Sequence, residues 1–209
     1  IVIAHGSQIT VYDVANNTSI ATLQAPSEHR YIQDLEVYDE SSGVIIATDG
    51  YNMSILEIVG NSLTSKFTGD FPSPDCNRIF VFNYDSDIRN EIGCFNSFGT
   101  LFSIFEVADN EITLKESNNM KFYAKGVAVD PSSASEQNLI ITSKESTNSD
   151  PWGVGLYHIR KTDNKGNTIW KSPPLIGEPS SHGIKIRNHP EKGLQALLST
   201  DQAMYQINP

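Results

Sequence analysis

Five polar or charged residues lead into similar apolar-rich segments at intervals along the chain. They are Asp34, the pair Asn77 and Arg78, Lys125, and His182. If these segments are equivalent strands of a repeated unit, the five side chains lie at the same end of their units, where connecting loops also gather. Loops that gather at one end of repeated units present a broad, rigid face for binding. We therefore predict that these five lead residues form a binding surface.

The chain contains two cysteines, Cys76 and Cys94. A hairpin that turns near residues 84–86 would place them opposite one another, which makes a cross-strand disulfide geometrically feasible. A pair of buried free thiols is the alternative.

Three asparagines stand in the Asn-x-Ser/Thr acceptor pattern for N-linked glycans, each near an expected turn. They are Asn16, Asn17 and Asn52. Such a short pattern also arises by chance. Together with a disulfide, it favours a secreted or lumenal protein.

Other groupings of reactive side chains carry weaker signals. The histidines show no zinc-binding spacing, and the cysteines form no Cys-x-x-Cys pair. Asp85 and Asp87 alternate as in a calcium loop but lack the Gly and final Glu that close one, so a solvated turn is favoured. Trp152 and Trp170 could stack on a sugar ring, although packing is the favoured role for both.

A repeat of about 40–50 residues would position the lead residues. Five hairpins align at one large apolar position, which is held by Tyr12, Leu56, Phe105, Tyr157 and Tyr205. Four hairpins have a strand before them and four have a strand after them, so a complete unit has strands A, B, C and D. The units are expected at residues 1–24, 31–68, 76–116, 120–172 and 181–208. No helix is expected, because no capping residue precedes a long apolar run of helical period.

Four-stranded units of this length are typical of β-propeller blades, whose sheets bury both faces against their neighbours. The sequence therefore predicts an all-β fold with about five antiparallel blades, in a single propeller domain or a large part of one, over residues 1–209. A β-sandwich is the alternative, and it would explain the strands but not their common pattern.

The two terminal blades are expected to be incomplete. The first begins at strand B and the last ends at strand C, so different blades carry the unpaired edges. We expect part of a six- or seven-bladed propeller, whose edges pair with the remaining strands or with a protein partner. A closed ring of five blades is the alternative.

Three segments resemble known propeller families. Residues 9–14, Ile-Thr-Val-Tyr-Asp-Val, resemble strand C of WD40 blades. Residues 126–131, Gly-Val-Ala-Val-Asp-Pro, resemble strand A of NHL, YVTN and SMP-30-like propellers. Residues 181–184, Ser-His-Gly-Ile, are similar to a segment of paraoxonase-like, calcium-dependent lactonases.

The lactonase resemblance implies a bound Ca²⁺ and a catalytic role for some lead residues. It makes Asp34 and Asn77 oxygen ligands of the metal and His182 a proton-transfer or binding residue. Arg78 and Lys125 depart from this pattern, because they would add positive charge to such a site.

Net charge and hydropathy restrict the partners. The 209-residue chain has a formal charge of −10, which would repel a phosphate backbone, so nucleic acid is not expected. No apolar run approaches the roughly 20 residues of a membrane span. The leading hypothesis is an extracellular, non-enzymatic binding propeller, and the alternatives are a calcium-dependent lactonase or esterase and a sugar-binding propeller.

Overall fold

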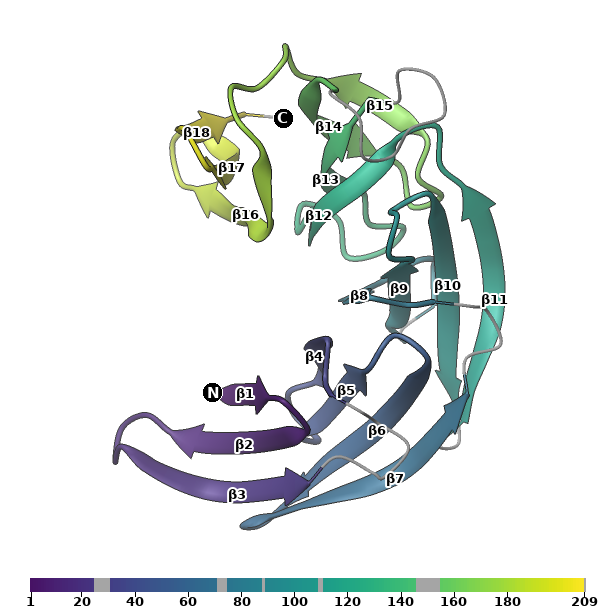
Figure 1. The fold of residues 1–209 in the computed structure, drawn as a ribbon, viewed down its shortest axis with the longest axis vertical. Coiled ribbons are helices and arrows are strands. Elements are labelled where there is room, and N and C mark those ends of the chain that lie inside the picture. Colours follow the sequence, from purple (N-terminus) through teal and green to yellow (C-terminus); the bar gives the residue numbers. More distant parts are fainter. Residues whose placement is uncertain (25–30, 71–74, 88, 109–110, 146–154, 209) are drawn as a thin grey trace. The chain divides into compact units, whose positions relative to one another are not determined.

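The computed structural model describes residues 1–24, 31–70, 75–87, 89–108, 111–145 and 155–208. Within these residues the chain forms eighteen strands and no helix. The strands build five sheets, and in each sheet neighbours in sequence are also neighbours in space (Figure 1). The all-β fold of small antiparallel sheets is therefore confirmed.

The sheets contain three, four, four, four and three strands, as the repeat predicts. The first has the order β1-β2-β3, formed by Val2–His5, Gln8–Asp13 and Thr18–Gln24. The second has the order β4-β5-β6-β7, formed by Asp34–Asp39, Val44–Thr48, Asn52–Val59 and Ser62–Asp70. The third has the order β8-β9-β10-β11, formed by Arg78–Phe82, Glu91–Phe95, Leu101–Ala108 and Glu111–Asn119.

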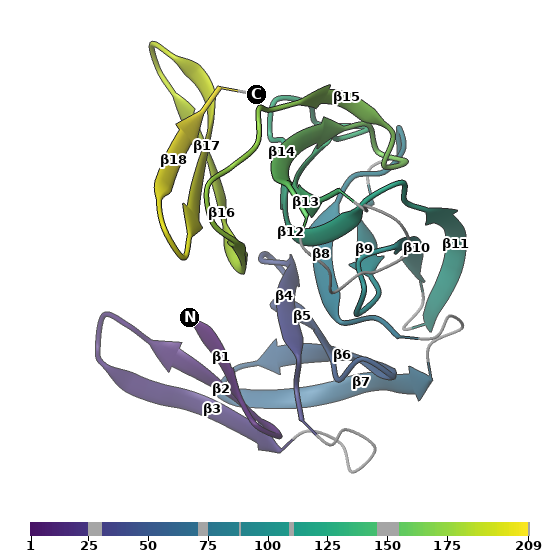
Figure 2. The same ribbon diagram turned by 45° about the horizontal axis from the view of Figure 1, so that its top comes forward.

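The last two sheets have the same meander order, which a second view also shows (Figure 2). The fourth is β12-β13-β14-β15, formed by Tyr123–Val129, Leu139–Lys144, Tyr157–Thr162 and Thr168–Lys171. The fifth is β16-β17-β18, formed by Pro179–His189, Gly193–Thr200 and Met204–Ile207.

The chain divides into two compact units, which are described separately. Unit 1 contains residues 1–81, 92–97 and 103–116. Unit 2 contains residues 82–91, 98–102 and 117–209. No helix in the described residues is long and apolar enough to cross a membrane.

In unit 1 the second sheet buries both of its faces. Ile45 packs in one core cluster with Ile9 and Val11 of the first sheet, whereas Ile46 packs in another with Ile79 of the third sheet. Consecutive residues of β5 thus face opposite neighbours, because side chains alternate across a strand. Each buried apolar side chain of this size contributes about 1.5–3 kcal/mol of transfer free energy.

Unit 2 shows the same arrangement between the fourth and fifth sheets. Ile140 and Ile159 pack against Ile184, Ala196 and Leu198. Trp170 lies against this cluster, partly buried. Packing therefore accounts for Trp170, and Trp152 lies outside the described residues.

Candidate functional site

In unit 1, Asp34 begins β4 and Arg78 begins β8. The Asp34 carboxylate accepts two backbone hydrogen bonds, from the N–H of Leu35 to Oδ1 at 2.9 Å and from the N–H of Ile79 to Oδ2 at 2.9 Å. The second bond ties β4 to β8. Both carboxylate oxygens of Asp34 are thus engaged by protein donors.

Arg78 lies beside this tie and is half-buried. Its burial lowers the pKa of the guanidinium from the ordinary value, and the negative charge of Asp34 acts in the opposite direction. Nη1 of Arg78 is buried and has no hydrogen-bond partner in the described structure. This nitrogen is therefore a buried donor that the described residues leave unsatisfied.

Two hydrogen bonds of the neighbouring Cys76 backbone hold Asn77 against the second sheet. The Cys76 N–H donates to the Gly50 carbonyl at 2.8 Å, and the Thr48 hydroxyl donates to the Cys76 carbonyl at 3.0 Å. Gly50 has φ of +94°, and a Cβ there would lie 2.5 Å from Oδ1 of Asn77. Only glycine adopts this conformation readily and leaves room for the Asn77 amide.

Two exposed tyrosines flank the same corner of unit 1. Tyr31 is 51% exposed, and its hydroxyl accepts a hydrogen bond from Nε2 of Gln33 at 3.0 Å. Tyr51 follows Gly50 directly and is 73% exposed. Together with Arg78 and Asn77, these two tyrosines form what we call the tyrosine surface.

A disulfide joins Cys76 to Cys94, with Cα atoms 5.8 Å apart. Both residues are 2% exposed and belong to the core cluster between the second and third sheets. The bond is compatible with the pairing expected from the hairpin, and it fixes the segment that carries Asn77.

In unit 2, Lys125 lies where the register between β12 and β13 shifts, between Ala124 and Gly126. Such a bulge redirects a side chain. The ammonium of Lys125 lies 3.0 Å from Oε1 of Glu178, the residue that precedes β16. The hydrogen bond from Lys125 is the main reason why the pKa of Glu178 lies below its ordinary value.

Tyr157 belongs to the same corner of unit 2. Burial, followed by the negative charge of Glu178, raises the pKa of the Tyr157 phenol to about 12. The Glu178 N–H donates to Oδ1 of Asp201 at 2.7 Å. Lys125 is thus part of a polar cluster between β12 and β16.

The structure therefore brings the lead residues together in two separate groups. Asp34, Asn77 and Arg78 meet in unit 1, and Lys125 meets Glu178 in unit 2. The backbone of His182 is part of β16, but its side chain lies outside the described residues.

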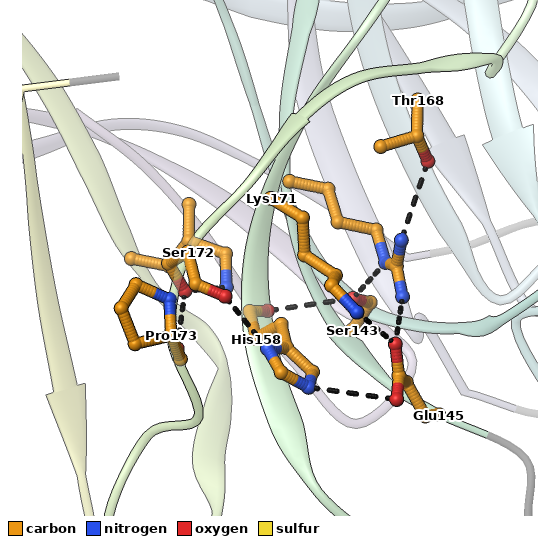
Figure 3. A network of polar contacts seen from close by, with 9 residues as sticks. Ser143, Glu145, His158, Thr168, Lys171, Ser172 and Pro173 are labelled. Carbon is orange, nitrogen blue, oxygen red and sulfur yellow. Dashed lines mark hydrogen bonds and ion pairs between the residues drawn. The ribbon is translucent and has the colours of Figure 1, made fainter.

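Unit 2 also contains a network that the lead positions do not include (Figure 3). Oε1 of Glu145 accepts from Nη2 of Arg160 at 3.0 Å and from Nζ of Lys171 at 2.5 Å. Its other oxygen lies 3.7 Å from Nε2 of His158, which is 3% exposed. Nδ1 of His158 lies 2.9 Å from the Ser172 carbonyl, which can only accept, so Nδ1 carries the proton.

One carboxylate thus serves several cationic groups in this network. The hydrogen bond from Lys171 is the largest cause that lowers the pKa of Glu145, and the charges of His158 and Arg160 act in the same direction. Nε of Arg160 also donates to the Ser143 hydroxyl at 2.8 Å. A sequence signal existed, because His158 and Arg160 alternate on one face of β14, and two basic groups buried on one face require an acidic partner.

No family model and no curated protein matches this sequence. Among the solved structures that resemble it, the Dos1 propeller aligns with a TM-score of 0.60 and 12% identity, over 96% of this chain and 50% of that chain. A putative 6-phosphogluconolactonase (BF1038) from Bacteroides fragilis aligns with a TM-score of 0.56 and 15% identity, over 98% and 65%. The WD40 domain of SCAP from fission yeast aligns with a TM-score of 0.51 and 14% identity, over 96% and 44%. The chain has a β-propeller fold.

The likeness to these structures concerns the fold alone at such low identity, and it decides against the β-sandwich. This chain spans 44% to 65% of the length of the three structures. Its sheets are propeller blades, so Asp34 ties the second blade to the third, and Lys125 ties the fourth to the segment that leads into the fifth.

The third blade carries the acidic turn that the sequence partly identified. Carboxylate oxygens of Asp85, Asp87 and Glu91 lie within 4.8 Å of one another, the one such acidic group found among the described residues. Glu91 is 1% exposed, and one of its oxygens accepts from the Tyr84 N–H at 2.8 Å. The sequence pattern missed Glu91 because it lies beyond the turn, in strand β9.

The three possible glycan acceptors differ in their surroundings. Asn17 is exposed at the turn between β2 and β3, with φ of 51°. The amide of Asn16 donates to Oδ2 of Asp13 at 2.7 Å. Asn52 is half-buried, and its amide donates to Oδ2 of Asp49 at 3.2 Å. Asn17 therefore offers the most accessible amide of the three.

Proposed function

We propose that this propeller is an extracellular, non-enzymatic binding domain that recognises a protein through the lead positions of its blades. The observation that carries the proposal is the engagement of Asp34. Its two oxygens each accept a backbone N–H group at 2.9 Å, so the carboxylate joins two blades and has a structural role. Because Asp34 has this structural role, we assign recognition to the side chains around it.

The tyrosine surface has the composition of a protein-binding hot spot. Tyr31 and Tyr51 are exposed, and the half-buried Arg78 follows Asn77 directly in the chain. Tyrosine, tryptophan and arginine dominate the binding energy of protein interfaces, because they combine a large apolar area with hydrogen-bonding groups. The close approach of Gly50 to Asn77 fixes the backbone that carries Tyr51, so binding orders few backbone groups there.

A calcium-dependent lactonase is the second candidate function. It is favoured by the likeness of the fold to a structure described as a putative 6-phosphogluconolactonase, over 98% of this chain. Asp34, Asn77 and His182 would supply the metal ligands and the proton-transfer group. The positive charge of Arg78 near Asp34 weighs against a divalent cation at that carboxylate.

Crosslinking followed by mass spectrometry tests the binding proposal. The tagged chain is mixed with extracellular proteins of its source, crosslinked, and each candidate partner is then titrated in isolation. We expect one partner whose affinity falls at least about tenfold in the Tyr31→Ala/Tyr51→Ala variant, because each hot-spot truncation costs about 2 kcal/mol or more. Tyr12→Ala, at a tyrosine 40% exposed on β2, is the control and should bind normally.

The alternative function has its own readout in the same protein. Hydrolysis of a lactone panel is measured with about 1 mM Ca²⁺, a concentration suited to extracellular calcium sites. Calcium-dependent turnover that is lost in His182→Ala would overturn the non-enzymatic proposal. Partner binding that is unchanged in the Tyr31→Ala/Tyr51→Ala variant would overturn the assignment of the surface.

A further inference from the structure

A pocket of about 390 Å³ opens in unit 2 between two connecting segments. One segment, residues 118–122, leads from β11 into β12, and the other, residues 165–168, ends the turn between β14 and β15. Its volume falls within the roughly 300–1,000 Å³ of small-molecule sites. The residues that line the pocket include none of the lead residues and none of the residues of the tyrosine surface.

The lining of this pocket is cationic in an acidic protein. Lys121 and Lys165 lie on opposite segments, and none of the lining residues is acidic. The chain as a whole carries a formal charge of −10. The other polar lining groups are the amides of Asn118, Asn119 and Asn167 and the hydroxyl of Thr168.

A buried arginine adds positive charge behind the pocket wall. Arg160 is 8% exposed, its Cζ lies 4.6 Å from the centre of the Phe122 ring, and its Nη1 donates to the Thr168 hydroxyl at 3.4 Å. Both Phe122 and Thr168 line the pocket. The four cations Lys121, Lys165, Arg160 and Lys171 stand against two carboxylates at this corner, those of Glu145 and Asp163. The resulting positive field favours an anion.

Both walls are fixed before any ligand arrives. The Asp163 carboxylate accepts hydrogen bonds from the N–H groups of Lys165 and Asn167 and from the Asn167 amide, at 2.8 to 3.0 Å. On the opposite wall the Met120 N–H donates to the Thr100 carbonyl at 2.8 Å. Binding therefore orders few groups, which lowers its entropic cost.

We propose that this pocket binds a monosaccharide that carries an oxyanion, either a uronic acid or a sugar phosphate. The ammonium groups of Lys121 and Lys165 make charge-assisted hydrogen bonds to the carboxylate or phosphate. The asparagine amides both donate and accept, as sugar hydroxyls do. The site would give the propeller a small-molecule ligand in addition to its protein partner.

Isothermal titration calorimetry on the whole chain tests this assignment with four probes: glucuronate, glucose 6-phosphate, glucose and inorganic phosphate. We expect at least one acidic sugar to bind at least about tenfold more tightly than glucose and than phosphate, because both the charged group and the hydroxyls contribute. Preference between glucuronate and glucose 6-phosphate distinguishes the two oxyanions. Equal binding of glucose and the acidic sugars, stronger binding of phosphate alone, or binding of none of the probes would each overturn the proposal.

The pocket is located with matched charge variants. Lys121→Ala/Lys165→Ala should weaken the acidic sugar at least about tenfold. Lys185→Ala/Lys192→Ala removes the same charge from exposed positions of the fifth blade and should leave affinity unchanged. In the unaltered protein, the bound sugar should also protect Lys121 and Lys165 from acetylation, as mass spectrometry reports. Equal effects of the two double variants, or acetylation unchanged by the sugar, would place the ligand elsewhere.

Discussion

Asp34 accepts a hydrogen bond at Oδ2 from the backbone N–H of Ile79 at 2.9 Å, across the boundary between the second and third blades. The bond joins residues 45 positions apart, so it can form only when two blades are already side by side. Lys125 and Glu178 make the corresponding connection in unit 2, between a strand of the fourth blade and the segment before the fifth. A polar tie at the lead end thus supplements the apolar packing between blades.

Asp34→Ala is expected to lower the free energy of unfolding by about 1.5–3 kcal/mol, the range for hydrogen bonds to charged groups. The variant leaves the Ile79 N–H without its acceptor and removes the negative charge beside Arg78. Asp34→Asn should cost less, because the amide oxygen can still accept from Ile79. Equilibrium unfolding in urea measures both variants, and equal losses for Ala and Asn would contradict the backbone tie.

Glu145→Gln is expected to destabilise the fourth blade by about 2 kcal/mol. Removing one partner of a fully buried ion pair costs about 3–5 kcal/mol, but solvent screens part of this interaction. Glu145 is 35% exposed, whereas the Arg160 side chain is only 10% exposed. Ser143→Ala is a useful comparison, since it removes a neutral partner of the same arginine.

The cost of Glu145→Gln should depend on pH. Hydrogen bonding to Lys171, followed by the charges of His158 and Arg160, holds the pKa of Glu145 below its ordinary value of 4.5. The carboxylate therefore stabilises the folded state fully above about pH 4.5 and ceases to do so as pH falls through the lower folded pKa. Urea unfolding at a series of pH values should show the difference from the unaltered protein shrinking in acid, and a constant difference would count against the ion pair.

The sheets were predictable because their signal is local and repeated. Ile45 and Ile46 are consecutive apolar residues, and a strand buried on both faces requires such a run. The turn residues on either side fix where β5 ends. Not every aligned position behaves alike: Leu56 and Phe105 are fully buried, whereas Tyr12 is 40% exposed.

The side-chain clusters were harder to predict because they depend on contacts between blades and on strand irregularities. Lys125 was expected at the entry to strand A but lies within β12, which begins at Tyr123, and the bulge at its contact with Glu178 is not encoded in the pattern. Glu145 and Arg160 meet only when β13 and β14 pair. A single sequence shows how residues alternate along a strand, but it does not show which charged residue of a neighbouring segment will contact them.

Tyr157 should resist ionisation in alkali. Burial, together with Glu178 and Asp201, raises the pKa of its phenol from 10.0 to about 12. The neutral phenol therefore contributes stability that is fully present below about pH 10 and is lost as pH rises through about 12. In a titration followed at the phenolate absorbance band, Tyr157→Phe should match the unaltered protein until about pH 11, and an earlier loss of signal would contradict the shift. Glu178→Gln should move the Tyr157 transition toward lower pH.

The Cys76–Cys94 disulfide should contribute about 3 kcal/mol to stability, as expected for a closed loop of this length. The two residues are separated by 18 positions. Cys76→Ala/Cys94→Ala should lower the urea midpoint, and a reducing agent should lower the midpoint of the unaltered protein but not that of the variant. Alkylation of two free thiols in the unreduced, unfolded protein would show that the bond is absent.

Asn17 is predicted to carry an N-linked glycan when the chain is made in a secretory host. Its side chain is exposed at the turn before β3, whereas Asn52 is half-buried and its amide is bound to Asp49. A glycan at Asn52 would have to break that bond, and the amide of Asn16 is similarly held by Asp13. Asn17→Gln leaves the acceptor pattern of Asn16 intact and should abolish the mass removed by a glycosidase. Asn16→Gln and Asn52→Gln are the controls, and a glycan that persists in Asn17→Gln but is lost in Asn52→Gln would show that accessibility in the folded blade does not decide the site.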